Sequence, residues 1–183
     1  MEFTSTPIPD LYVAKLMPIT DSRGFFMRSY CEDELKKIGV NKKIRQINHS
    51  CTANVGAVRG MHYQKPDRAE IKMVRCIFGS VFDVAIDLRE GSETFLHWYG
   101  QYLTRENQKM MIIPEGFAHG FQVIEPDSEL LYFHTDIYTP ELERGILFDE
   151  KRVGVKWPME VCDLSDRDLA HKKLSDSFTG IKI

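Results

Sequence analysis

A histidine and an arginine stand among small residues in segment 56–64, which reads Gly-Ala-Val-Arg-Gly-Met-His-Tyr-Gln. An imidazole exchanges protons near neutral pH, and a guanidinium binds phosphates or carboxylates in a forked geometry. Side chains alternate along a strand, which puts His62 on one face and Arg59 on the other. Gly60 lies between them and could mark a bulge or a close backbone approach that turns both groups toward one cavity. The alternative is a half-buried strand with a hydrogen-bonded histidine.

A second histidine, His119, follows the turn-forming residues 114–116, so we expect it at the mouth of a barrel strand, or else ordering the turn. The two histidine segments resemble the half-motifs of the cupins, small β-barrels that often bind a metal through three histidines and a carboxylate. Gln64 stands where a metal-binding cupin has its second histidine. Too few ligands then remain for a tight divalent site, and we expect no metal.

Three further residues allow either a functional or a structural interpretation. Tyr132 shares a strand face with other polar residues of segment 130–138, but a buried tyrosine can also be a core residue with a bonded hydroxyl. Lys72 falls on an otherwise apolar strand face, where an ammonium is costly unless the strand is an edge. Asp168 completes a Ser-x-x-Asp pattern from Ser165, so its carboxylate could simply cap a helix.

Short strands are the main structural signal. Apolar alternation and turn residues predict strands over 11–17, 25–30, 44–50, 57–64, 71–78, 81–88, 96–103, 109–113, 120–124 and 130–138. We expect a two-residue turn at Gly79-Ser80, one clear helix over 31–38 with Gly39 after its end, and a short helix near 166–169. The pattern predicts an all-β double-sheet jelly roll, a cupin-like barrel, with a few short helices.

Length and composition narrow the classes of protein. With 183 residues we expect one domain over 1–183, in which 150–183 form a C-terminal appendage that packs back on the barrel. The net charge of -3 and a pI near 6.1 argue against nucleic acid as a partner. No export signal or long apolar run is recognisable, so we expect a cytoplasmic protein that does not bind a membrane. Four scattered cysteines fit reduced thiols better than a disulfide or zinc framework.

Several segments form a set of longer motifs: 23–26, 46–50, 58–64, 82–89, 113–121 and 143–145. Over about residues 10–170 this set is similar to the signatures of the dTDP-4-dehydrorhamnose 3,5-epimerase family. The resemblance implies an isomerase on a metal-free, cofactor-free cupin jelly roll, usually a homodimer. Its expected substrate is a nucleotide-linked 4-keto-6-deoxyhexose, inverted at C3, C5 or both.

The resemblance also implies roles for matching residues. His62 corresponds to the general base, Asp168 to the carboxylate that orients it, and Tyr132 to the general acid. Lys72 and His119 correspond to polar groups near the sugar. Further residues at positions where the family contacts substrate are Gln46, Asn48, Arg59, Glu143 and Arg167.

The nucleotide region is where the chain departs from the family. Arg23 and Phe26 match residues that reach the nucleotide from the partner subunit, and Tyr138 matches one that stacks near the base. Arg28, which we also count as substrate-binding, replaces a usual glutamate, and Ile47 replaces a usual aspartate. These two substitutions leave the identity of the base open.

The chemistry accounts for these residue types. A ketone at C4 acidifies the hydrogens on C3 and C5, so a neutral imidazole can remove one as a proton and leave an enolate. The ammonium of Lys72 can stabilise the enolate oxygen. Inversion requires the proton to return from the opposite face, which Tyr132 on another strand can do. The arginines suit the diphosphate.

Two other classes of function remain open. One is a metal-dependent cupin oxygenase or isomerase, which would contain stoichiometric iron, nickel or zinc. The other is a catalytically silent cupin that binds a sugar nucleotide without introducing solvent hydrogen at C3 or C5.

Overall fold

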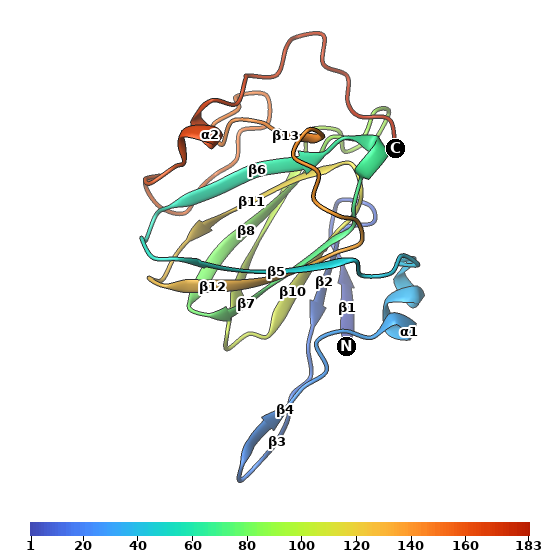
Figure 1. The fold of residues 1–183 in the computed structure, drawn as a ribbon, viewed down its shortest axis with the longest axis vertical. Coiled ribbons are helices and arrows are strands. Elements are labelled where there is room, and N and C mark those ends of the chain that lie inside the picture. The colour runs from blue at the N-terminus through green and yellow to red at the C-terminus, as the bar shows by residue number, and fades with distance from the viewer.

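The computed structural model describes residues 1–183, most of which belong to short strands (Figure 1). The strands are β1 (Glu2–Ser5), β2 (Tyr12–Lys15), β3 (Ile19–Asp21), β4 (Gly24–Phe26), β5 (Gln46–Thr52), β6 (Val58–Gln64), β7 (Lys72–Phe78), β8 (Ser80–Asp87), β9 (Trp98–Thr104), β10 (Lys109–Ile113), β11 (Phe117–Val123), β12 (Ser128–His134) and β13 (Glu143–Gly145). The helices are α1 (Glu32–Leu35), η1 (Lys36–Ile38), η2 (Pro66–Arg68) and α2 (Asp166–Leu169).

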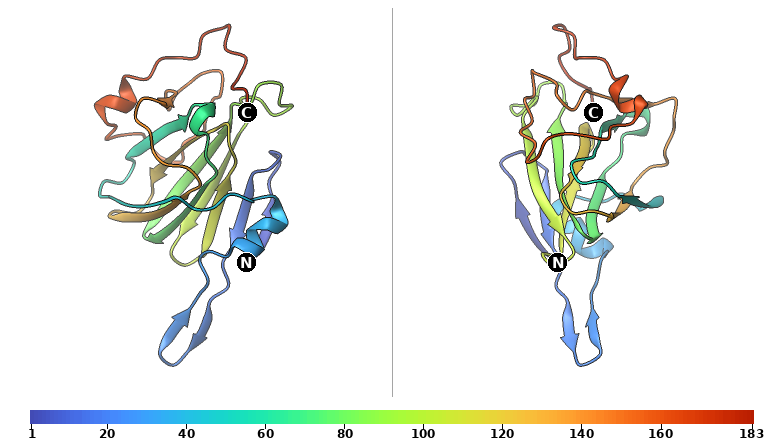
Figure 2. Two further views of the ribbon diagram at one scale, coloured as in Figure 1. Left: turned by 45° about the vertical axis from the view of Figure 1, so that its right-hand side comes forward. Right: turned by 90° about the vertical axis from the view of Figure 1, so that its left-hand side faces the viewer.

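Two antiparallel sheets face each other (Figure 2). The six-stranded sheet has the order β1-β2-β10-β7-β12-β5, and the five-stranded sheet has the order β13-β6-β11-β8-β9. Their facing side chains form the largest buried cluster, which includes Val74 and Leu130 from the first sheet and Ala85 and Phe121 from the second. This arrangement confirms the predicted double-sheet jelly roll.

Strand β8 is buried along its whole length, because each of its faces packs against a different cluster. Val81 and Ala85 belong to the core between the sheets. Val84 and Ile86 face outward and are covered by the C-terminal segment, which contributes Trp157 among others. The side chains of β8 therefore alternate between its two faces as predicted, and apolar residues are needed on both faces because both are buried.

The predicted turn at Gly79-Ser80 does not join a hairpin. Ser80 already belongs to β8, which pairs with β9 and β11, whereas β7 pairs with β10 and β12. The chain crosses here from one sheet to the other. Gly79 has a φ of +71°, and a Cβ at this position would lie 2.4 Å from the hydroxyl of Ser128, so the crossing requires a glycine.

Other element boundaries also differ from the prediction. Strand β11 begins at Phe117, so His119 lies within the strand rather than at its mouth. Strand β12 ends at His134, and Asp136 beyond it pairs with Arg45 and Arg68 instead of continuing the polar face. Strands β1, β3 and β13 were not predicted; each is short and pairs with one neighbouring strand. The predicted strand over 25–30 is reduced to β4, which ends at Phe26.

The predicted helices are confirmed. The segment 31–38 forms α1 and then η1, and Gly39 follows in the left-handed conformation with a φ of +84°. Helix α2 lies beside β6 (Figure 1). None of the helices has the length and apolar character that crossing a membrane requires.

Candidate active site

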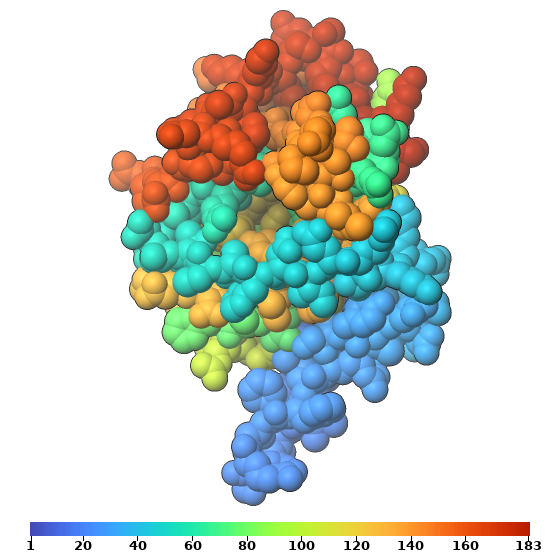
Figure 3. Space-filling model, viewed as in Figure 1, coloured from blue at the N-terminus to red at the C-terminus, as the bar shows by residue number.

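A cavity of about 550 Å³ opens between the sheets, with its mouth between β5 and the segment that carries β13 (Figure 3). Ten of the residues predicted from sequence line it: Gln46, Asn48, Arg59, His62, Lys72, His119, Tyr132, Tyr138, Glu143 and Arg167. The structure therefore brings together residues that lie up to about 120 positions apart in the sequence. Asp168 does not line the cavity but lies behind His62, to which it is bonded.

A bulge in β6 turns Arg59 and His62 to the same side. Arg59 pairs with Phe121 and His62 pairs with His119. The two β6 residues are three positions apart and their partners only two, so β6 has one extra residue here. The extra residue shifts the alternation of side chains, and both polar groups face the cavity. Gly60 has a φ of +134°, and a Cβ there would lie 2.5 Å from the backbone of β11. The bulge and close approach predicted at this glycine are both present.

His62 is held by a buried carboxylate. Its Nε2 lies 2.7 Å from Oδ1 of Asp168, whose Oδ2 accepts a bond from the Gly60 amide at 3.3 Å. Burial raises the pKa of Asp168, but the bonds from His62 and Gly60 outweigh this and lower it to about 2. Since a carboxylate only accepts hydrogen bonds, Nε2 carries the proton, and Nδ1 of His62 is left as the basic nitrogen.

Of the two roles that the sequence left open, the Asp168 carboxylate has the one at His62, and the helix cap is made by Ser165 instead. The hydroxyl of Ser165 accepts a bond from the Asp168 amide at 3.1 Å and so caps α2. The cap thereby fixes the start of the helix and points the Asp168 carboxylate at His62. The capping pattern and the functional site are parts of one local structure.

The guanidinium of Arg167 lies against the His62–Asp168 pair. Arg167 donates to Oε2 of Glu143 at 2.9 Å, and its guanidinium lies 3.3 Å from Nε2 of His62 and 3.6 Å from Oδ1 of Asp168. Glu143 also accepts a bond from the Tyr138 hydroxyl at 2.9 Å. These contacts join the mouth of the cavity to the imidazole.

The ligand atoms of His62, Asp168 and His171 lie within 4.8 Å of one another, close enough to hold a metal ion. The guanidinium of Arg167 already presents a positive charge to two of them, which disfavours a second cation. Gln64 adds no ligand, because its amide bonds the backbone of Arg68, Ile137 and Thr139. The residues present therefore do not fit a tight metal site.

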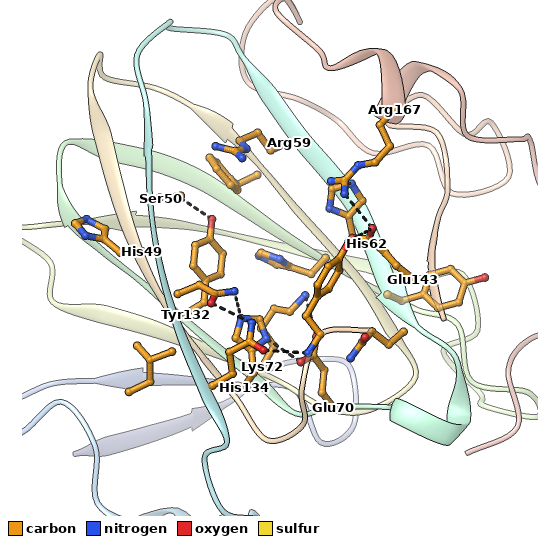
Figure 4. Close-up of a pocket in the computed structure, with 18 residues that line it drawn as sticks. His49, Ser50, Arg59, His62, Glu70, Lys72, Tyr132, His134, Glu143 and Arg167 are labelled. Carbon is orange, nitrogen blue, oxygen red and sulfur yellow. Dashed lines mark hydrogen bonds and ion pairs between the residues drawn. The ribbon is translucent and has the colours of Figure 1, made fainter. Parts of the chain in front are cut away.

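Tyr132 stands on the opposite wall from His62 (Figure 4). It comes from β12 of the six-stranded sheet, whereas His62 comes from β6 of the five-stranded sheet. Its hydroxyl lies 3.1 Å from that of Ser50. Burial raises the pKa of Tyr132 to about 12, so the phenol keeps its proton at neutral pH and can donate it.

Lys72 and His119 also line the cavity, Lys72 on the wall of Tyr132 and His119 on the wall of His62. Lys72 begins β7, which has β10 and β12 as neighbours, so the edge-strand interpretation of this lysine is wrong. His119 bonds Oδ1 of Asp83 through Nε2 at 2.7 Å. Burial lowers the pKa of His119, which keeps the imidazole neutral beside the ammonium.

Several polar residues of the site were not predicted: Ser50, Glu70, Asp83, His134 and His171. His134 lies on the polar face recognised in segment 130–138, and that is the only sequence signal that could have identified it. Glu70 has no periodic pattern around it. The position of the Glu70 side chain depends on its hydrogen bond to His134 of β12, 64 residues away in the sequence.

Three predicted residues lie outside this cavity. Arg23 and Phe26 belong to the β3–β4 hairpin, which projects away from the sheets (Figure 1). Their side chains are exposed, and Arg23 pairs with Asp21 of the same hairpin at 2.6 Å. Arg28 pairs with Glu34 of α1 at 2.6 Å and does not reach the cavity.

The comparisons with known proteins agree with the geometry. The sequence profile of dTDP-4-dehydrorhamnose 3,5-epimerase matches residues 5–176. The chain belongs to this family. The family member from Pseudomonas aeruginosa is 41% identical over 179 residues, which are 97% of this chain and 98% of that one. The one from Shigella flexneri is 40% identical over 178 residues, again 97% and 98% of the two chains.

Solved structures of the family have the same fold. A Legionella pneumophila 3,5-epimerase in complex with dTDP-4-keto-L-rhamnose has a TM-score of 0.93 and 35% identity, covering 100% of this chain and 98% of that one. A Bacillus anthracis dTDP-4-dehydrorhamnose 3,5-epimerase with TDP and PPi bound has a TM-score of 0.91 and 33% identity, covering 94% and 99%. The family and the cupin-like jelly roll predicted from the motifs are both confirmed.

Proposed function

We propose that this chain is a cofactor-free epimerase that inverts C3 and C5 of a nucleotide-linked 4-keto-6-deoxyhexose, converting dTDP-4-dehydro-6-deoxyglucose to dTDP-4-dehydrorhamnose. The observation that carries the proposal is an imidazole, His62, held by Asp168 and facing a protonated phenol, Tyr132, across one cavity. The names of the relatives and the sugar nucleotide bound in the Legionella structure support this substrate class.

The residues divide one inversion between the two walls. Nδ1 of His62 takes the proton from the carbon beside the C4 ketone, and the electron pair of the broken C–H bond forms an enolate. The ammonium of Lys72 stabilises the negative charge on the enolate oxygen. Tyr132 then gives its proton to the opposite face of the carbon. Exchange with solvent returns a proton to the phenolate and removes one from the imidazolium, which Asp168 has stabilised meanwhile.

The mouth of the cavity suits the rest of the substrate. Arg59 and Arg167 offer guanidinium groups to the diphosphate, and Gln46 and Asn48 offer amides. Tyr138 supplies an aromatic face on which a base can stack.

All four cysteines are free thiols, which agrees with a cytoplasmic enzyme.

Exchange with heavy water tests the proposal. Incubation with dTDP-4-dehydro-6-deoxyglucose in D₂O is expected to place deuterium at both C3 and C5, each observed separately by NMR. Deuterium at only one carbon would make the chain a mono-epimerase. Binding without deuterium at either carbon, with any nucleotide, would contradict the proposal and favour the silent sugar-nucleotide-binding cupin.

We also propose a homodimer in which the β3–β4 hairpin completes the partner's site. The hairpin leaves the body of the chain with Ile19, Phe25 and Phe26 exposed, which is unfavourable unless another surface covers them. Arg23 on the same hairpin could then reach the partner's nucleotide.

The variant Phe26→Ser tests this arrangement. Burying a phenylalanine contributes about 1.5–3 kcal/mol, so its loss is expected to weaken substrate binding and raise KM about tenfold or more. Sedimentation analysis of the wild type should give the mass of a dimer. A monomeric wild type that is fully active, or an unchanged KM in the variant, would exclude the hairpin from the site.

A further inference from the structure

Besides His62–Asp168 and His119–Asp83, the cavity has a third histidine that bonds a largely buried carboxylate. Nδ1 of His134 lies 2.8 Å from Oε2 of Glu70, and both side chains are about 10% exposed. The other oxygen of Glu70 lies 3.6 Å from Nζ of Lys72. The pair therefore connects β12 to the ammonium in the cavity (Figure 4).

The hydrogen bonds around His134 all run in one direction. The amide of Gln46 donates to Oδ1 of Asn48 at 3.0 Å, and the amide of Asn48 donates to Nε2 of His134 at 3.3 Å. Nε2 is then the acceptor, so Nδ1 carries the proton and donates it to Glu70. A continuous chain of bonds runs from the mouth of the cavity to Glu70.

The strand register explains why these residues meet. His134 is the register partner of Lys72 on β7 and of Gln46 on β5. Glu70 lies just before β7, in a connection that does not itself fix the side chain. The bond from His134 is what holds the carboxylate beside the ammonium.

The side chain of Lys72 is only 13% exposed. A charged group removed from water is costly unless an opposite charge lies beside it. Glu70 is the one carboxylate with an oxygen within 4.0 Å of the Lys72 Nζ. Burial raises the pKa of Glu70, but the bond from His134 and the charge of Lys72 outweigh this and lower it, so Glu70 is an anion.

We propose that Glu70 is a positioning residue for Lys72, held in place by His134, and that it acts on the reaction only through the ammonium. The inference rests on the proposed function, in which Lys72 stabilises the enolate. The anion of Glu70 lowers the positive potential near the enolate, so its benefit lies in holding the Lys72 ammonium in one position.

The variant Glu70→Gln is expected to lower kcat about tenfold or more while KM changes less than about threefold, because the ammonium is misplaced and the binding groups at the mouth are intact. His134→Phe should reproduce this split, and His134→Gln, which keeps a donor for Glu70, should restore part of kcat. Glu129→Gln is the matched control. Glu129 bonds His49 at the same 2.8 Å, but both side chains are more exposed and neither pairs with Lys72.

A double-mutant cycle with Lys72→Met separates positioning from a direct or structural role. If Glu70 acts through Lys72, Glu70→Gln adds no further loss when Lys72 is already methionine. Deuterium incorporation followed over hours keeps such slow variants measurable. Additive losses, a faster Glu70→Gln enzyme, or full activity in Lys72→Met would each overturn the inference. Wild-type exchange, measured alongside, tests the proposed function separately.

Discussion

His62→Asn is expected to reduce deuterium incorporation at both sugar carbons by at least about 10³-fold, within the range typical of general acid–base catalysis. The asparagine amide has no basic nitrogen. His49 and His134 lie on the wall of Tyr132, and His119 points its Nε2 at Asp83, so none of them occupies the position of the His62 imidazole. Without a base on this wall the enolate does not form, so inversion and exchange stop together.

Loss of the Asp168 carboxylate should slow the reaction less than loss of the His62 imidazole. Asp168→Asn keeps a polar group beside His62 but removes the anion that fixes its tautomer and stabilises the imidazolium. We expect about a 10²-fold loss, at the lower end of the same range. His97→Asn, at an exposed histidine outside the cavity, is the control and should be fully active. Near-normal exchange in a folded His62→Asn protein would exclude this imidazole as the base.

Local sequence patterns predicted the parts of the site that depend on neighbouring residues, namely the bulge in β6 and the start of α2. Gly60 between Arg59 and His62 indicated a bulge because a glycine inside a strand rarely packs well, and the structure shows that bulge. Ser165 and Asp168 indicated a helix start, and α2 begins there. Each of these features depends on residues that are close together along the chain.

Sequence reasoning could not place contacts that depend on strand order. Whether Lys72 lay on an edge strand depended on β7 lying between β10 and β12, strands that begin 37 and 56 residues later in the chain. The contact between Glu70 and His134 spans 64 residues and follows from the register of β12 on β7. Gly79 was recognised as a turn, but not as the point at which the chain changes sheets.

The resemblance to a family supplied part of this long-range information. It grouped His62, Tyr132 and Asp168 before any geometry was available, and the structure places all three at one cavity. It gave no indication of Glu70 or His134, because neither falls within the matched roles. Residues particular to this chain are found only from their contacts.

Tyr132→Phe is expected to separate exchange from inversion. His62 can still remove the proton and form the enolate, and after exchange with solvent it can return a deuteron to the same face. Deuterium should therefore enter the unreacted sugar, while the inverted product falls about 10²-fold or more, since the proton donor on the other wall is missing. NMR of a single D₂O reaction measures both rates.

The structure supports a clean comparison at this position. The phenol has one protein partner, the hydroxyl of Ser50, and phenylalanine keeps the ring that packs beside His119 and His134, so the fold should be retained. Tyr99→Phe, whose hydroxyl bonds Gln101 outside the cavity, is the matched control. Undiminished inversion in Tyr132→Phe would mean that water or another group protonates the second face. Loss of exchange and inversion to the same extent would mean that the phenol acts before the enolate forms, in which case the two walls do not divide the reaction between abstraction and return of the proton.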